Sequence, residues 1–367
     1  MKIDSIKDSN STYIFVSFLL LFFINSGFSR TIDNILLIFL CFTIFFTQLK
    51  YSRRQLIIIV VTITASMIMY ALKLWTNFSF MLSMWINVIA LSFVIKRDEI
   101  NINSSAAILL LFFTMFILTI QLALNFNGKR FVLNYGDPNF SGGIVLLFFY
   151  IANKFKSLPS ILFAVFVSFL LLSRNLVFSI ILFYLVSVLT TKIRLKIPSF
   201  LSFFNLTIIS AVASIAISFL FLTNVIEFKE AGGANRIITI ADSGNFQRFS
   251  TNIALIMYWF QNPSHFFWGL GDFKDIIKEF NRVTVHNSYL SLIAKYGIFF
   301  FVSYTMFISS SIKKERIINN LPYVISYLFF MAFLHDFYFG IYFIVFIIII
   351  HIRGNNETIG SNLSLSR

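Results

Sequence analysis

Long apolar runs that contain almost no charge dominate this chain. Twelve can be marked out, at residues 12–29, 32–49, 55–72, 76–95, 105–125, 139–153, 157–172, 175–191, 199–223, 288–310, 320–336 and 338–352. A helix that crosses the roughly 30 Å hydrocarbon core of a bilayer needs about 17–25 apolar residues. The runs are continuous rather than alternating, and backbone groups in lipid must be satisfied within the segment, which favours helices over barrel strands. We therefore expect an all-α polytopic integral membrane protein with about twelve transmembrane helices.

The composition supports this class and leaves little for a soluble domain. Hydrophobic residues make up 58% of the 367 residues and charged residues only 12%, whereas a soluble domain has about 25% charged residues. A single membrane domain over residues 1–367 is therefore expected. The runs at 139–153 and 338–352 are short, and each could instead form one half of a re-entrant pair.

The distribution of Lys and Arg predicts the orientation of the spans. With the N-terminus in the cytoplasm, the inside connections hold seventeen basic residues and the short outside loops hold five. The five outside residues are Arg30, Lys73, Lys129, Arg130 and Arg174. The positive-inside rule then predicts that both termini are cytoplasmic. The net charge of +14 is explained by this topology, so nucleic-acid binding is not expected.

One outside connection, residues 224–287, is far longer than the others. Its six basic and six acidic residues cancel, so anion binding there must come from particular residues. The stretch "NFQRFSTNIALIMYWFQ" predicts a helix with an aromatic-rich side at the membrane surface. The stretch "NPSHFFWGLGDF" predicts a turn at Gly269 and Gly271, followed by a short amphipathic helix. Long ordered loops are usually functional, so this outside loop is expected to carry part of the functional site.

Two candidate sites lie in short outside loops. In "GKRFVLNYGDPNFSGG", Arg130 precedes a turn that contains Asp137 and Asn139; the alternatives are a tight loop and a contact to an anion or sugar. In "LLSRNLVFS", Arg174 stands between two apolar runs. It could be a snorkelling arginine, but a charge at the membrane without an evident acidic partner favours a functional site.

The long loop and the span that follows it contain the other candidates. Arg248 lies at the start of the predicted aromatic helix, and "VHNSYL" places His286 directly before Asn287 and Tyr289. Asn287 or the following serine can cap a helix, and Tyr289 can lie at the membrane interface. Neither role needs a histidine. Lys295, further into the span, is expected to border a polar cavity or to pair with Asp336.

Several catalytic motifs are absent from the sequence. It contains no HExxH, no acidic pair of the DxD type on an outside loop, no cluster of Cys and His, and no glycine-rich phosphate loop. Metal catalysis is not expected, and no metal site or cofactor is predicted.

Taken together and in order, these pieces resemble the bacterial O-antigen polymerase and O-antigen ligase superfamily. They are "R…GDPN" around Arg130, "SR" at Arg174, the loop arginine Arg248, the "GLGDF" turn and "HNSYL…YGIF" from His286. The resemblance covers roughly residues 125–301, and the first four spans show hydropathy alone. One departure is "SRN", where the family often has Ser-Arg-Gly.

The resemblance implies an inverting, metal-independent glycosyltransferase in the bacterial inner membrane. Its donor would be an undecaprenyl-diphosphate-linked oligosaccharide at the periplasmic face. Arg174 and Arg248 would bind the diphosphate and stabilise it as the leaving group. His286 would act as general base on the acceptor hydroxyl, a task that suits a side chain titrating near neutrality. Weaker substrate contacts are expected at Arg130, Asp137, Asn139, Asn287 and Tyr289.

The acceptor distinguishes the alternatives. A polymerase uses a second lipid-linked repeat unit, and a ligase uses lipid A–core. The "GDPN" motif and the compact length favour a polymerase of O-antigen or capsule, with membrane lipid and a chain-length regulator protein as further partners. A polyprenyl-linked glycan flippase is the alternative from another class. Its polar groups should line a central cavity formed by several spans, whereas here they gather at one face and no inverted repeat is visible.

Overall fold

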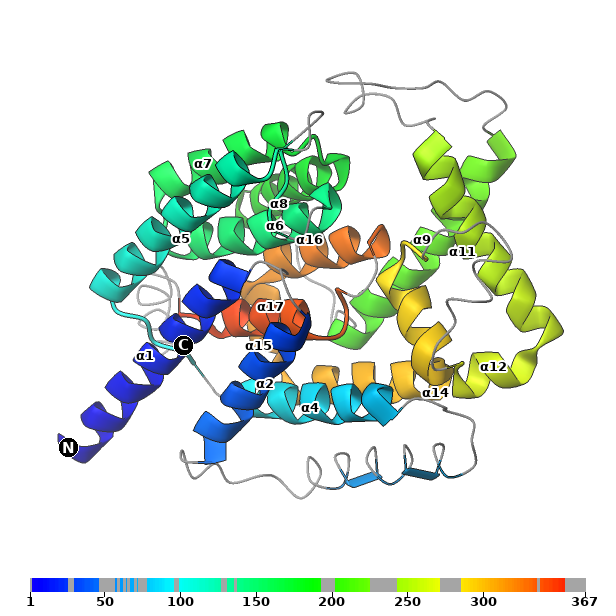
Figure 1. The fold of residues 1–367 in the computed structure, drawn as a ribbon, viewed down its shortest axis with the longest axis horizontal. Coiled ribbons are helices and arrows are strands. Elements are labelled where there is room, and N and C mark those ends of the chain that lie inside the picture. The colour runs from blue at the N-terminus through cyan, green and yellow to red at the C-terminus, as the bar shows by residue number, and fades with distance from the viewer. Residues whose placement is uncertain are drawn as a thin grey trace.

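The computed structural model describes residues 2–25, 30–45, 78–95, 99–126, 131–134, 137–192, 202–224, 243–270, 285–334 and 337–353, with single positions between 57 and 71. This part of the chain is helical (Figure 1). The helices are α1 (Lys2–Asn25), α2 (Arg30–Phe45), α4 (Phe78–Ile95), α5 (Ser104–Leu124), α6 (Pro138–Lys154), α7 (Leu158–Leu170), α8 (Arg174–Lys192), α9 (Phe203–Asn224), α11 (Ser243–Gln261), α12 (Pro263–Trp268), α14 (Ser288–Ser311), α15 (Lys314–Asn319), α16 (Leu321–Ala332) and α17 (Ile341–His351).

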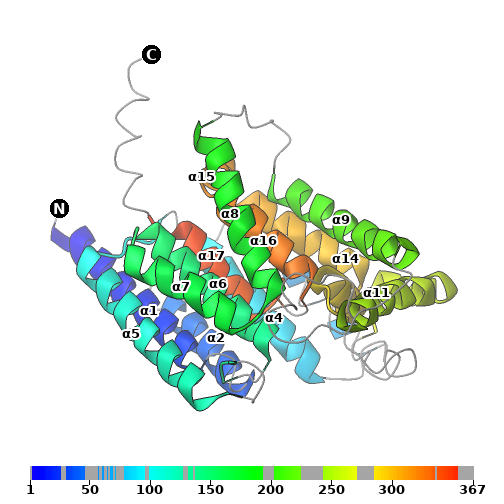
Figure 2. The same cartoon turned by 90° about the horizontal axis from the view of Figure 1, so that it is seen from above.

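The helices are arranged around α17, which lies near the middle of the molecule (Figures 1 and 2). On one side α1 packs against α2 and α5, and α2 packs against α4. On the other side α9 packs against α11, α14 and α16. The two sides are joined because α17 contacts α4 and α6 while α6 also contacts α8. One continuous cluster of buried apolar residues runs through all of these helices.

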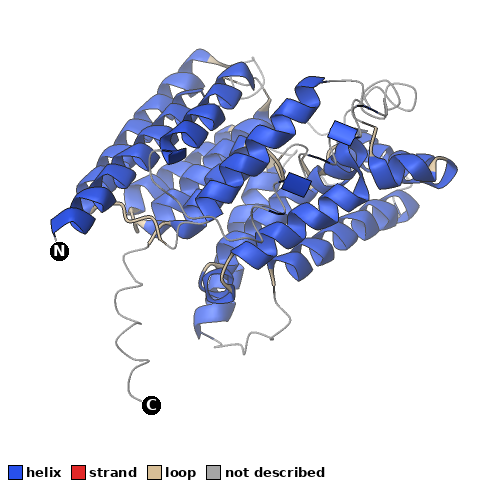
Figure 3. Cartoon of the chain, turned by 90° about the horizontal axis from the view of Figure 1, so that it is seen from below, coloured by secondary structure: helices blue, strands red, loops and turns tan. Residues whose placement is uncertain are grey.

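No strand is present among the described residues, which Figure 3 draws as helices and loops. Two isolated bridges join Ile100 to Ile352 and Phe126 to Phe131. Eleven of the twelve expected apolar segments contain a helix, and the twelfth, 55–72, falls largely outside the described residues. The expected all-helical class is therefore confirmed.

Four helices in the described part of the chain are long and apolar enough to cross a membrane: α5, α8, α9 and α14. The other apolar helical stretches that the structure describes have only 10–17 residues. At 1.5 Å per residue the 11 residues of α17 extend about 17 Å, well below the thickness of a hydrocarbon core. The re-entrant alternative therefore stays open for residues 338–352. The 17 residues of α6 extend about 26 Å, so by its length α6 remains a candidate membrane span.

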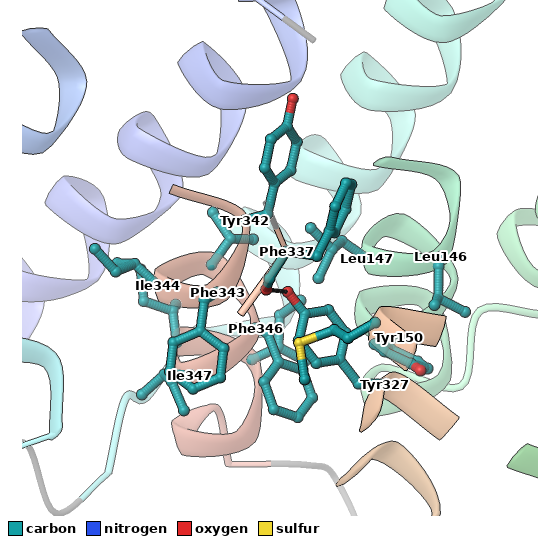
Figure 4. Packing of buried hydrophobic residues seen from close by; sticks show 14 of the residues in the cluster. Leu146, Leu147, Tyr150, Tyr327, Phe337, Tyr342, Phe343, Ile344, Phe346 and Ile347 are labelled. Atoms are coloured by element: carbon teal, nitrogen blue, oxygen red, sulfur yellow. Dashed lines mark hydrogen bonds between the residues drawn. The ribbon is translucent and has the colours of Figure 1, made fainter. Parts of the chain in front are cut away.

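The core is built around α6 and α17, in which nearly every residue is buried. Every residue of α17 is buried, as expected for a helix with no polar face. Aromatic rings from α16 meet it, and Tyr327 stacks on Phe346 with ring centroids 4.0 Å apart (Figure 4). The Tyr327 hydroxyl donates to the carbonyl of Phe337 at 2.8 Å. A buried hydroxyl is thus satisfied, and it ties α16 to the segment leading into α17.

The segment 262–270 differs from the sequence-based expectation. Residues 263–268 form the short helix α12 rather than a turn, and the turn comes at Gly269, where φ is +81°. The amphipathic helix expected after it lies outside the described residues. The expected aromatic helix is confirmed as α11.

Candidate functional site

Side chains from α6, α8, α9, α11, α16 and the start of α14 enclose a cavity of about 200 Å³, which we call the arginine cavity. Its polar lining residues are Asn139, Arg174, Asn175, Asn245, Arg248 and His286. Its apolar lining residues are Leu172, Phe178, Ile217, Phe221, Phe249, Phe329 and Phe333. The three residues predicted to be catalytic, Arg174, Arg248 and His286, therefore line one cavity although they lie up to 112 positions apart in the chain.

Arg174 is positioned by the sharp turn between α7 and α8. Leu172 has φ of +49°, and the buried Ser173 packs against Gly142 of α6, where a Cβ would lie only 2.9 Å from the serine Oγ. The chain therefore turns close to α6, and Arg174 becomes the first residue of α8. Its Nη2 donates to Oδ1 of Asn245 at 3.2 Å.

The helix α11 presents three residues to the arginine cavity with helical spacing. Asn245, Arg248 and Phe249 stand at positions i, i+3 and i+4, which share one face of a helix. Phe249 is buried and packs its ring against Phe221 at 4.6 Å between centroids. This packing holds the polar face of α11 over the cavity, beside the start of α8.

His286 lies directly before a capped helix. The side chain of Asn287 accepts hydrogen bonds from the backbone N–H groups of Tyr289 and Leu290, at 3.0 and 3.1 Å. Asn287 is thus the N-cap of α14, as one of the two sequence alternatives predicted. Its Nδ2 also donates to Ser214 of α9 at 2.8 Å. These bonds hold the chain before α14 in place, and the half-buried His286 lines the arginine cavity.

The electrostatics of the arginine cavity favour an anion. Residues at the beginnings of three helices line it: Asn139 in the first turn of α6, Arg174 at the start of α8 and His286 just before α14. Helix N-termini carry unpaired N–H groups and partial positive charge. Two guanidinium groups add to this charge, and no carboxylate is present among the described lining residues.

The GDPN turn contributes one residue to the arginine cavity. Asn139 lines it, whereas Asp137 is the N-cap of α6, with Oδ1 accepting from the backbone N–H groups of Asn139 and Phe140 at 2.6 and 3.2 Å. The carboxylate of Asp137 thus has a structural role that the spacing Asp-Pro-Asn accounts for, since proline suits the first helical position. Arg130 lies outside the described residues.

Two of the weaker candidates do not reach the arginine cavity. Asn287 is fully buried in its capping role. Tyr289 is also fully buried; its hydroxyl donates to the carbonyl of Leu328 at 2.9 Å and lies 3.0 Å from the hydroxyl of Ser210. The ring of Tyr289 is enclosed by α9, α14 and α16 rather than exposed at the surface of the helices. The hydroxyl group needs partners when buried, and these helices supply them.

Two cavity residues were missed by the sequence analysis. Asn175 follows Arg174, and its Nδ2 donates to the carbonyl of Phe330 at 2.9 Å, tying α8 to α16. Its Oδ1 is buried without a hydrogen-bond partner among the described residues. Asn245 accepts from Arg174. Helical spacing from Arg248 could have identified Asn245, but only tertiary structure pairs it with Arg174.

The "GLG" and "YGIF" motifs meet in the structure. Gly297 interrupts α14 with φ of +85° and ψ of 163°. A Cβ at Gly297 would overlap the carbonyl of Phe267, and one at Gly269 would lie 2.6 Å from the backbone nitrogen of Gly297. The N–H of Leu270 donates to the carbonyl of Ala294 at 2.8 Å. Both glycines are thus required by a close backbone contact and by conformations that only glycine adopts readily.

Lys295 lies two residues before this kink, and it lines a second cavity that includes polar groups from α2 and α4. This placement agrees with the first of its two expected roles. Asp336, its other expected partner, lies outside the described residues.

Comparison of the chain with family models, with curated proteins and with solved structures finds no match.

Proposed function

We propose that this protein is a bacterial O-antigen or capsular polysaccharide polymerase, an inverting glycosyltransferase of the inner membrane. The observation that carries the proposal is the convergence of Arg174, Arg248 and His286 on one cavity. Two permanent cations and a side chain able to accept a proton are the groups that displacement of a diphosphate by a hydroxyl requires.

The proposed reaction is a single displacement. His286 takes the proton from a hydroxyl of the acceptor sugar as its oxygen bonds to the anomeric carbon of the donor. The bond from that carbon to the diphosphate oxygen breaks, and the diphosphate leaves with the electron pair. Arg174 and Arg248 neutralise the charge that develops on it, and a guanidinium suits this task because its planar fork matches phosphate oxygens.

The apolar wall of the arginine cavity suits a lipid-linked substrate. Phe178, Phe249 and Phe333 line it beside the two arginines, so a ligand must present an anionic group and a hydrocarbon surface together. A polyprenyl diphosphate has both. Free nucleotide sugars lack the hydrocarbon chain and would leave this wall uncovered.

The proposal includes twelve membrane spans with both termini in the cytoplasm and the arginine cavity at the periplasmic face. In that topology α6, α8 and α14 all run from the periplasm inwards, in agreement with the meeting of their N-termini at one cavity. The donor and acceptor would be undecaprenyl-diphosphate-linked oligosaccharides delivered to that face.

The test is complementation of a deletion strain. We expect the deletion to leave surface glycans with a single repeat unit and the intact gene to restore long chains. The variants His286→Ala and Arg174→Ala should reach the membrane at normal abundance and fail to restore them. Loss of a general base costs about 10²–10⁴-fold in rate. The variant Gln247→Ala, on the exposed side of α11, is the matched control and should restore full length.

The outcomes separate the alternatives. Core without any repeat unit in the deletion strain would identify a ligase, and repeat units trapped on the cytoplasmic leaflet would identify a flippase. Full-length chains from both His286→Ala and Arg174→Ala would show that the proposed mechanism is wrong.

A further inference from the structure

A second cavity, of about 300 Å³, lies between α2, α4, α14 and the start of α17; we call it the lysine cavity. It begins close to the arginine cavity, because Ser288 lines it and His286, two residues earlier, lines the other. Its polar lining is Asp33, Asn34, Ser83, Asn87, Ser288 and Lys295. The reaction proposed for the arginine cavity uses none of these groups.

The side-chain oxygen of Asn87 is a buried hydrogen-bond acceptor that receives no hydrogen bond from the described residues. The residue is only 3% exposed, and its Nδ2 donates to the carbonyl of Ser83 at 2.7 Å. Rotating the amide would place its oxygen against that carbonyl, so the orientation is fixed. Oδ1 has no hydrogen-bond partner among the described residues. It lies near Gly340, another lining residue, at 3.9 Å from where a Cβ would stand. Leaving a buried acceptor unsatisfied costs about 1–3 kcal/mol.

The charged groups of the lysine cavity are of both signs. Asp33 supplies a carboxylate, with Oδ1 accepting from Asn25 at 2.6 Å, and Lys295 supplies an ammonium group that only donates. A phosphate group would meet Lys295 favourably, but its oxygens would face the carboxylate and the fixed acceptor of Asn87. Each hydroxyl group of a polyol donates one hydrogen bond and accepts others, so several hydroxyl groups on one ring can together satisfy all three.

The walls of the lysine cavity complete a site for a ring-shaped polyol. Tyr296, Phe339 and Tyr342 line it, and the first two rings pack together at 5.4 Å between centroids. Aromatic walls with a few placed polar groups are the usual design of a small-ligand pocket, and the volume is at the lower end of the range for such pockets, about 300–1,000 Å³.

We propose that the lysine cavity is a carbohydrate-binding site that holds one uncharged sugar residue. Lys295 and Asn87 contact its hydroxyl groups, and the aromatic walls contact its C–H faces. Sugar binding follows from the lining of this cavity alone. That the sugar belongs to one of the two lipid-linked glycans rests in addition on the proposed function.

The test uses the purified full-length protein in detergent and two probes. One probe is short oligosaccharides cut by mild acid from the surface polysaccharide of the host, with binding followed by saturation-transfer NMR. The other is pyrophosphate, with binding followed by calorimetry. We expect Asn87→Leu and Lys295→Met each to weaken oligosaccharide binding about tenfold, the effect of losing about 1.4 kcal/mol, and to leave pyrophosphate affinity within about twofold.

Controls separate binding from folding. Lys313→Met, at the exposed residue that precedes α15, should match the wild type with both probes. Lys295 is half-buried, so its variant is expected to keep the wild-type melting temperature even where Asn87→Leu does not. Arg174→Ala should lose pyrophosphate and keep the oligosaccharide.

Three results would overturn the inference. The first is that the wild type binds no oligosaccharide, as expected of a cavity that holds only water. The second is that Lys295→Met binds the oligosaccharide as tightly as the wild type does. A loss of pyrophosphate with Lys295→Met would identify a phosphate site instead. By contrast, oligosaccharide binding without any pyrophosphate binding would count against the proposed function and leave the sugar site standing.

Discussion

Arg174 shows how a single residue is given its place by the tertiary structure. Its guanidinium donates to Asn245, an uncharged acceptor, so the contact orients the arginine without neutralising it. A carboxylate in the same place would hold the group more firmly but would cancel its charge. The choice of an amide is therefore expected at a site that binds anions.

This argument predicts opposite effects of Asn245→Asp on stability and on binding. The variant keeps an acceptor for Arg174, so we expect a melting temperature at or above that of the wild type. The new negative charge should weaken pyrophosphate binding at least about tenfold, and more than Asn245→Ala does. Calorimetry on the purified protein measures both effects. Equal pyrophosphate affinities for Asn245→Asp and the wild type would argue against an anion site, and Gln247→Ala serves as the neutral control on the same helix.

At the scale of elements, the site depends on how helices begin. The caps of α6 and α14, Asp137 and Asn287, set where those helices start, and the residues beside the caps reach the arginine cavity. Further along α14 the kink at Gly297 lets α12 approach, which anchors the segment that follows α11. The helix α14 thus connects both cavities with the long loop.

The kink predicts the effect of Gly297→Ala. Its φ and ψ belong to a region almost restricted to glycine, worth about 1–3 kcal/mol of strain for another residue, and the new methyl group would overlap the carbonyl of Phe267. We expect the free energy of unfolding to fall by more than that strain alone. Thermal melting of the purified protein measures it. Ser303→Ala, an exposed position on the same helix, should be neutral, and equal melting of the two variants would contradict the prediction.

At the scale of the whole molecule, the apolar runs were sufficient to locate the long apolar helices, because hydropathy over 15 to 25 residues is a strong local signal. The short helices α12 and α15 were not expected from it. The same signal does not give the length of each helix in the folded chain: the run at 338–352 forms a helix of only 11 residues, α17. For the site, local chemistry made Arg174 and His286 candidates, and the resemblance added Arg248 and implied the role of each. Local chemistry could not show whether Asp137 and Asn287 cap a helix or contact the substrate, because Asp and Asn are used for both roles. Asn175 and Lys295 acquire meaning only from helices that are distant in sequence.

The proposed topology makes a prediction about the molecule as a whole: α14 should separate two compartments. Its 24 residues extend about 36 Å, enough to cross the hydrocarbon core even with a kink. The arginine cavity lies at its start, and the exposed Lys314 follows its end.

We expect Gln247→Cys, beside Arg248, to react with a membrane-impermeant maleimide in intact spheroplasts, and Lys314→Cys to react only after permeabilisation. Both are made in a Cys41→Ser background, which removes the one native cysteine. Labelling of both positions from the same side would place the arginine cavity and the loop after α14 on one side of the membrane. The proposed topology and a reaction at the periplasmic face would then both be wrong.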